Sequence, residues 1–122
     1  MLTRLMFGGG GTAQVLIMQA GSQFVTSGRY YYGYASEYGS LTPSYIEYKG
    51  ERYVISAFYT TPYNVTLLTF TNNLPDTIPT VTVEVNGVKY TLERMSATGN
   101  YRLVKGVFTS TGTYRIRILS IG

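Results

Sequence analysis

The sequence predicts an all-β fold: a single β-sandwich, Ig-like or jelly-roll-like, of about seven or eight short antiparallel strands. Three observations predict this class. The 122 residues include 13 tyrosines and 14 glycines, only 13% are charged, and residues that favour helices are few. Short runs of β-branched and aromatic residues alternate with turn residues along the chain. No stretch has a convincing helical pattern, and we expect a sandwich rather than the partly open five-stranded barrel.

The start of the chain differs from the rest. Residues 1–11 end in four consecutive glycines, and large apolar residues precede them. These apolar residues are Leu2, Leu5, Met6 and Phe7. Because glycine weakens any regular element, we expect a flexible docking arm at 1–11 and the β-sandwich domain at 12–122. The arm is either a frayed terminus or a segment that docks onto a neighbouring chain.

The first half of the domain contains apolar and aromatic runs separated by glycine, serine and proline. Strands are expected at 13–18 and 30–34, with an edge piece at 24–26. Strand periodicity places alternate tyrosines of the second run on one face, namely Tyr30, Tyr32 and Tyr34. A loop is expected where Gly39, Ser40 and Pro43 follow.

The next stretch predicts a hairpin around Lys49-Gly50. A two-residue loop there sets Glu47 opposite Arg52 and Ile46 opposite Tyr53. The second strand of this hairpin is apolar on both faces, as expected for a strand covered on two sides. One of the two faces comprises Tyr53, Ile55, Ala57 and Tyr59. A further strand is expected at 63–71, before a turn-rich segment.

The best-specified element is a hairpin at 81–95. Asn86-Gly87 predicts a type I′ loop, which sets Val85 opposite Val88. In this register Val83 faces Tyr90 and Val81 faces Leu92, so one face is apolar. On the other face Thr82 faces Thr91 and Glu84 faces Lys89. Turn chemistry and patterning therefore predict the same register.

The last third adds a strand at 101–108 and a final strand after the turn at 109–112. The final strand alternates between two kinds of residue. Tyr114, Ile116 and Ile118 are expected to point inward, and Arg115 and Arg117 to point to water.

The composition excludes several chemistries. The chain has no cysteine and no histidine, so disulfides, thiolate nucleophiles, Ser-His relays and ordinary metal sites are not expected. The net charge of +4 comes from scattered Lys and Arg rather than from a basic run. We interpret this charge as a solubility feature and do not expect nucleic acid as the main partner. No cofactor is expected.

The N-terminal stretch does not predict membrane insertion. Its apolar pieces are short and interrupted by the glycines, so no signal-peptide core forms and no bilayer-spanning segment is present. We expect a soluble protein made in the cytoplasm.

The acids give little support for an enzyme. Glu47 and Glu51 are the only close pair, and solvated hairpin residues with basic neighbours are the simpler interpretation. The four glycines are not followed by the Lys-Ser/Thr of a phosphate-binding loop. We therefore predict no enzymatic activity and no catalytic residue.

The stretch 27–63 holds ten of the tyrosines and is the natural candidate for a contact surface. Most of these rings are expected in strands that pack the sandwich. The contact candidates are the 30–34 strand face and the loop residues, that is Tyr30, Tyr32, Tyr34, Tyr38 and Tyr45. Three partners stay open: another protein, a sugar, or single-stranded nucleic acid stacked on the rings.

Residues 31–43, YYGYASEYGSLTP, resemble modules of tailed-bacteriophage virion proteins, in which a YGY strand precedes a GSL-Ser/Thr-Pro turn. Further motifs extend the resemblance to about Tyr30–Ile118. They are the Lys49-Gly50 turn, the aromatic pair Phe58-Tyr59, the Val-Asn-Gly hairpin with YTL, and the closing GTYRIRI. The spacing between Pro43 and Gly50 is longer than in that pattern, and the first part of the chain has no counterpart in it.

The resemblance implies a non-enzymatic structural protein of a virion, assembled in the host cytoplasm. A tail or fibre position and a capsid-decorating position are both open. Expected partners are other virion proteins and copies of the chain itself, with a host-surface glycan as a further option. The alternative function is a free carbohydrate- or single-stranded-nucleic-acid-binding β domain.

Overall fold

A computed structural model describes residues 14–25, 28–34 and 38–122, which form ten strands. No helix occurs among these residues, so the expected all-β class is confirmed. The strands are β1 (Gln14–Val25), β2 (Gly28–Tyr32), β3 (Gly39–Thr42), β4 (Tyr45–Tyr48), β5 (Glu51–Thr60), β6 (Thr66–Phe70), β7 (Thr80–Val85), β8 (Val88–Arg94), β9 (Tyr101–Leu103) and β10 (Gly112–Ile121).

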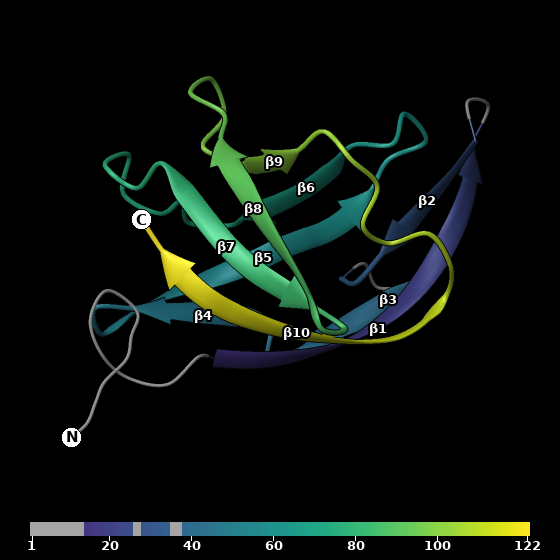
Figure 1. Cartoon of the computed structure of the whole chain (residues 1–122), viewed down its shortest axis with the longest axis horizontal. Coiled ribbons are helices and arrows are strands. Elements are labelled where there is room, and N and C mark those ends of the chain that lie inside the picture. Colours follow the sequence, from purple (N-terminus) through teal and green to yellow (C-terminus); the bar gives the residue numbers. More distant parts are fainter. Residues whose placement is uncertain (1–13, 26–27, 35–37) are drawn as a thin grey trace.

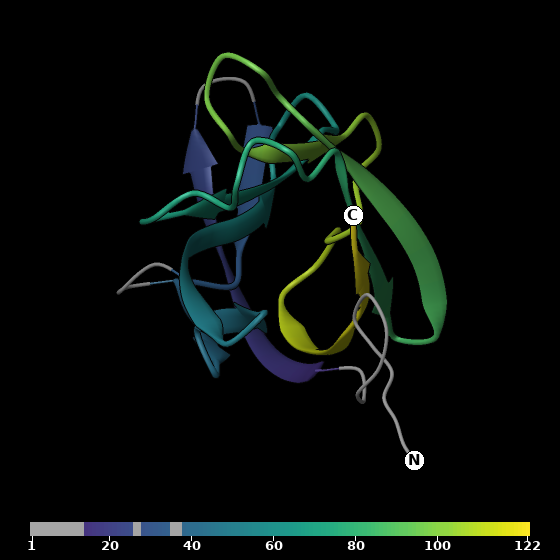
Figure 2. The same cartoon turned by 90° about the vertical axis from the view of Figure 1, so that its left-hand side faces the viewer.

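The predicted sandwich is wrong: eight of the strands close into a barrel (Figures 1 and 2). The pairing runs β10-β7-β8-β9-β6-β5-β2-β1, and β1 then pairs with β10 to complete the circle. β3 adds to β1 and β4 adds to β5 outside this circle. Short alternating strands are equally compatible with two packed sheets or one closed sheet, so the sequence pattern could not distinguish them.

The strand that closes the barrel is longer than expected. The prediction ended it before Gly21, but β1 continues through Gly21 to Val25. Its first half pairs with β10 on one edge and with β3 on the other, and its second half pairs with β2. A Cβ atom on Gly21 would lie 1.3 Å from the Tyr38 carbonyl oxygen. The glycine therefore admits a crossing chain rather than ending the strand.

β2 and β3 lie one after the other along the same edge of β1. Tyr32 pairs with Gly21 and Gly39 pairs with Ala20, so the end of β2 and the start of β3 meet adjacent positions of β1. Directly after β2 the Gly33 N–H donates to the Phe58 carbonyl on β5 (2.9 Å). The loop predicted at Gly39, Ser40 and Pro43 is therefore wrong for residues 39–42, which form β3.

A β-bulge corrects the predicted faces of β5. The pairing with β6 shifts between Ile55 and Ala57, so Ser56 is an extra residue. Ile55 and Phe58 are both buried, although alternation assigned them to opposite faces. A bulge changes the phase of alternation, which is why Ala57 and Tyr59 do not share the face of Ile55.

The predicted hairpins are confirmed. β7 and β8 have the expected register around Asn86-Gly87, whose φ angles of 49° and 89° fit a type I′ turn. β4 and β5 pair as expected around Lys49-Gly50, which also has positive φ angles. In β10 the inward residues Tyr114, Ile116 and Ile118 are buried, and the two arginines between them are exposed.

The strand predicted at 101–108 ends early, since β9 covers only Tyr101–Leu103. The chain after β9 is held by side chains instead of a strand ladder. The buried Thr66 hydroxyl donates to the Lys105 carbonyl (2.7 Å) and accepts from the Val107 N–H (2.9 Å). The Thr60 hydroxyl accepts from the Phe108 N–H (2.9 Å) and lies 3.0 Å from that of Thr66.

Aromatic residues pack the barrel interior. Phe108 contacts the rings of Phe58 and Tyr114 edge to face, at centroid distances of 4.8 Å and 5.0 Å. Near one end, the buried Tyr101 hydroxyl donates to the Ile78 carbonyl (2.7 Å) and accepts from Arg94 (3.1 Å). Burial raises the pKa of Tyr101, and the hydrogen bond and charge of Arg94 oppose that rise. The interior thus serves packing, and the outer surface is where contact residues must be sought.

Candidate interaction surface

Four tyrosines gather on the outside of the barrel, and we call Tyr30, Tyr32, Tyr38 and Tyr59 the tyrosine face. Tyr32 is at its centre, with ring centroids 5.5 Å from Tyr30, 5.5 Å from Tyr59 and 5.8 Å from Tyr38. The Tyr38 ring is stacked on Tyr32, and Tyr30 meets both Tyr32 and Tyr59 at an edge. All four rings are half-buried, so the cluster presents partly covered rings to solvent.

Strand register explains this arrangement. Tyr32 pairs with Tyr59, and these two residues point outward because Tyr31 and Phe58 point to the core. Tyr30 lies two residues before Tyr32 and shares its side of the strand. Tyr38, directly before β3, lies beside Tyr32 at the end of β2. The tyrosine face therefore depends on the pairing of β2 with β5 within the barrel.

Two hydroxyl groups of this face, those of Tyr32 and Tyr59, have a raised pKa and resist ionisation. Burial raises the pKa of Tyr32, and ionised Tyr30, Tyr59 and Tyr38 nearby would raise it further. Burial and Tyr30 likewise raise the pKa of Tyr59. The Tyr32 hydroxyl donates to the Gln23 side-chain oxygen (3.3 Å). At neutral pH these groups are neutral donors and acceptors of hydrogen bonds.

The surroundings of the tyrosine face are uncharged among the described residues. Tyr59 pairs with Leu67 on β6, and Arg102 on β9 marks the border of the patch. The described outward residues on this side, from β1, β2, β6 and the part of β5 beyond the bulge, are Gln23, Val25, Tyr30, Tyr32, Ala57, Tyr59, Leu67 and Thr69.

The opposite side of the barrel is charged. The outward residues of β7, β8 and β10 include Glu84, Lys89, Glu93, Arg115 and Arg117, and we call this side the charged wall. Arg117 forms an ion pair with Glu84 across β10 and β7 (3.1 Å). Interface cores are depleted of charge and enriched in tyrosine, so the tyrosine face is the better contact candidate.

The other predicted contact residues lie apart from this face. Tyr34 is 41% exposed just after β2, on the segment that leaves β1. Tyr45 is on β4, with the Arg52 guanidinium 4.4 Å from its ring centroid. Leu2, Leu5, Met6 and Phe7 lie outside the described residues. The structure thus brings together Tyr30, Tyr32 and Tyr38, and it adds Tyr59, which no local signal marks because the bulge at Ser56 decides its face.

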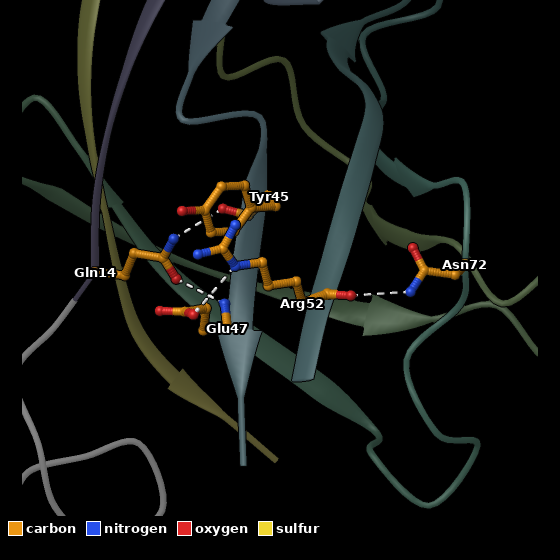
Figure 3. Close-up of polar contacts among 5 residues, drawn as sticks. All are labelled: Gln14, Tyr45, Glu47, Arg52 and Asn72. Carbon is orange, nitrogen blue, oxygen red and sulfur yellow. Dashed lines mark hydrogen bonds and ion pairs between the residues drawn. The ribbon is translucent and has the colours of Figure 1, made fainter. Parts of the chain in front are cut away.

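Side-chain hydrogen bonds from outside the β4–β5 hairpin hold its backbone in place, as Figure 3 shows. The Gln14 side chain donates to the Tyr45 carbonyl (2.8 Å) and accepts from the Glu47 N–H (2.8 Å). On the other side Asn72 donates to the Arg52 carbonyl and accepts from the Val54 N–H, both at 3.0 Å. Each carboxamide substitutes for a peptide group of a neighbouring strand, so both edges of the hairpin are partly satisfied.

The acid pair considered for catalysis does not converge. Tyr48 pairs with Glu51 and Glu47 pairs with Arg52, so Glu47 and Glu51 point to opposite faces of the hairpin. Glu47 instead forms an exposed ion pair with Arg52 (3.4 Å). Among the described residues no group of His, Cys, Asp or Glu is arranged to hold a metal ion. The part of the chain that the structure describes contains no helix long and apolar enough to cross a membrane.

Comparison of the chain with protein-family models, with curated proteins and with solved structures found no match.

Proposed function

We propose that this chain is a non-enzymatic structural protein of a tailed-bacteriophage particle, tail- or fibre-associated or capsid-decorating. It assembles through the tyrosine face and the N-terminal arm at 1–11. The setting is inferred from the resemblance of residues 30–118 to virion modules. The mode of assembly is inferred from one observation, the uncharged cluster of Tyr30, Tyr32, Tyr38 and Tyr59 on the outside of the barrel.

Three properties of this cluster support a protein partner. Half-buried tyrosines supply large contact area and lose little side-chain entropy on binding. The raised pKa of Tyr32 and Tyr59 keeps these two hydroxyls neutral, so they pair with the peptide groups of a partner without the cost of burying a charge. The neighbouring Leu67 extends the apolar area across β6. A chain of net charge +4 meets another copy or a basic partner with least repulsion through such an uncharged face.

The test is attachment of the labelled chain to phage particles assembled without it, followed by co-sedimentation. Tyr59→Lys places a charge in the tyrosine face and should reduce attachment at least about tenfold, because a buried unpaired charge costs several kcal/mol. Ser120→Lys adds the same charge at an exposed position of β10 and is the matched control. Deletion of residues 1–11 should abolish attachment while leaving a folded monomer.

Undiminished attachment of both Tyr59→Lys and the arm deletion would overturn the proposed mode of assembly. Failure of the unmodified chain to attach to any particle would overturn the virion setting. Binding of single-stranded DNA that weakens steeply with salt, or of an oligosaccharide, with loss in Tyr59→Lys, would instead support the alternative function.

A further inference from the structure

The barrel contains an open strand edge on β8, on the side away from the tyrosine face. β7 pairs with β8 at six positions, from Val85–Val88 to Thr80–Glu93. On its other edge β8 pairs with β9 at only two positions, Glu93 and Arg94. Among the described residues no strand covers this edge between Val88 and Leu92.

The register identifies which backbone groups are free. Residues that flank a two-residue hairpin loop exchange hydrogen bonds, and such pairs then alternate along an antiparallel ladder. Val88, Tyr90 and Leu92 therefore bond to β7, whereas Lys89 and Thr91 point their N–H and C=O groups away from it. The Arg94 N–H continues the series of Val88, Tyr90 and Leu92, because it donates to the carbonyl of Pro79, directly before β7 (2.9 Å).

The edge is open because the chain after β9 bonds to side chains of β5 and β6 instead of pairing with β8. Thr60 and Thr66 bind the backbone at 105–108 through their hydroxyls, as described above. Figure 1 shows the chain turning away from β8 directly after β9. The backbone groups of Lys89 and Thr91 are therefore left without a strand ladder at this edge, in the part of the chain that the structure describes.

The side chains around the edge define the chemistry of a ligand. A hollow of about 260 Å³ lies where β9 ends, lined by Thr91, Glu93, Arg102, Leu103 and Val104. Val104 is 73% exposed and Val88 is 52% exposed, so apolar surface is available here. Lys105 lies over the Tyr90 ring, with its Nζ 5.7 Å from the ring centroid. Three cations, Lys89, Arg102 and Lys105, and two acids, Glu84 and Glu93, thus border the edge, and Glu84 is already ion-paired with Arg117.

We propose that the open edge of β8 binds an extended acidic segment of another polypeptide by strand addition. The segment exchanges backbone hydrogen bonds with Lys89 and Thr91. Its side chains alternate: acidic residues lie on the outer face beside Lys89 and Arg102, and apolar residues lie beside Val88 and Tyr90. An acidic segment suits the edge better than the β8 edge of a second copy, because two such edges would bring the Lys89 and Arg102 cations of both copies close together.

The first test is hydrogen exchange of the free chain, measured residue by residue by NMR. The amides of Lys89 and Thr91 should exchange faster than those of Tyr90 and Leu92, which bond to β7. Equal protection of all four amides would show that the edge is already covered and would overturn the proposal.

The second test is titration of the full chain with two capped synthetic peptides, one alternating Glu with Val and the other alternating Lys with Val. The acidic peptide should bind and slow the exchange of the Lys89 and Thr91 amides, and the basic peptide should not. Thr91→Pro removes the edge N–H without removing a bond to β7 and should weaken binding about fivefold or more. Thr91→Val keeps the N–H and is the matched control.

Lys89→Glu provides a variant that keeps the backbone unchanged. It should weaken binding of the acidic peptide and strengthen binding of the basic one, even if Thr91→Pro disturbs the hairpin. The proposal would be overturned if the acidic peptide did not bind the unmodified chain. It would also be overturned if Lys89→Glu left the affinity for each of the two peptides unchanged. These tests use the β8 edge alone and do not depend on the virion setting.

Discussion

The charged wall and the side that carries the tyrosine face are built by different means. On the charged wall, β7 and β8 meet through a type I′ turn, and β10 then pairs with β7 in a register broken only near its end, between Ile118 and Ser120. On the other side, β1 is shared by β10, β3 and β2, the chain leaves the β1 edge at residue 33, and β5 contains a bulge. Local signals specify the first side, whereas contacts between distant segments specify the second.

The two sides also present different chemistry to a partner. The charged wall alternates buried aliphatic residues with charged and hydroxyl residues, which suits a surface facing water. The outward residues around Tyr32 are neutral and mostly aromatic or apolar. The charged wall, whose strands pair regularly, thus presents residues that favour contact with water. The side with the β5 bulge carries the candidate contact surface, and bulges are common next to functional sites.

The largest difference between the two sides is expected for glycine substitutions. Gly21→Ala would place a Cβ atom against the Tyr38 backbone, so the chain at Tyr38 must move and the free energy of unfolding should fall by about 3 kcal/mol or more. Gly87→Ala has no atom within 4 Å of its Cβ but has φ +89°, and it should cost only about 1 kcal/mol. Urea unfolding of both variants measures the difference. Equal costs would mean that the close crossing at Gly21 does not constrain the fold.

An intermediate difference is expected for buried and exposed threonines. Thr66→Val removes the buried hydroxyl that bonds Lys105 and Val107. The part-buried Lys105 carbonyl loses this donor and the Val107 N–H is left with its longer bond to the Thr60 hydroxyl (3.2 Å), so the change should cost about 2 kcal/mol. Thr82→Val removes an exposed hydroxyl pair with Thr91 on the charged wall and should change stability by less than about 0.5 kcal/mol. Thermal and urea unfolding of the two variants provide the comparison. A loss of unfolding free energy below about 0.5 kcal/mol in Thr66→Val would contradict the role of this hydroxyl in holding the backbone at 105–108.

The smallest expected effect concerns alkaline pH and acts through the tyrosine face. The pKa of Tyr32 is raised above 10.0 in the folded chain, chiefly by burial, so the folded state keeps its proton at a pH where the unfolded state loses it. Its contribution to stability is therefore complete below pH about 10 and is lost as the pH rises through the folded-state pKa. Tyr32→Phe should make the alkaline fall in unfolding free energy shallower. Urea unfolding at a series of pH values checks this. An identical alkaline fall in unfolding free energy for the unmodified chain and Tyr32→Phe would refute it.

The candidate surface could be predicted only in part. Tyr30 and Tyr32 were expected on one strand face, and the structure places them there with Tyr38 stacked alongside. Tyr59 could not be assigned, because simple alternation puts it with the buried Ile55 and only the extra residue at Ser56 turns it outward. Tyr34 and Tyr45 were grouped with these residues but lie apart from them. Tyr34 comes after the end of β2, and Tyr45 is on β4, where it pairs with Val54, before the bulge of β5.

The sequence by itself determined the all-β class, the two hairpins with two-residue loops and the inward and outward residues of β10, because each depends on neighbours in the chain. Turn residues with positive φ and period-two alternation act over a few positions and need no distant partner. Only the tertiary structure decided that β1 and β10 meet to close a barrel, that β5 bulges, and that the chain after β9 bonds to Thr60 and Thr66 instead of pairing with β8. These features arise from contacts between residues far apart in the chain. An alternating pattern indicates the two faces of a strand, but it does not specify which distant strand pairs with it or in which register.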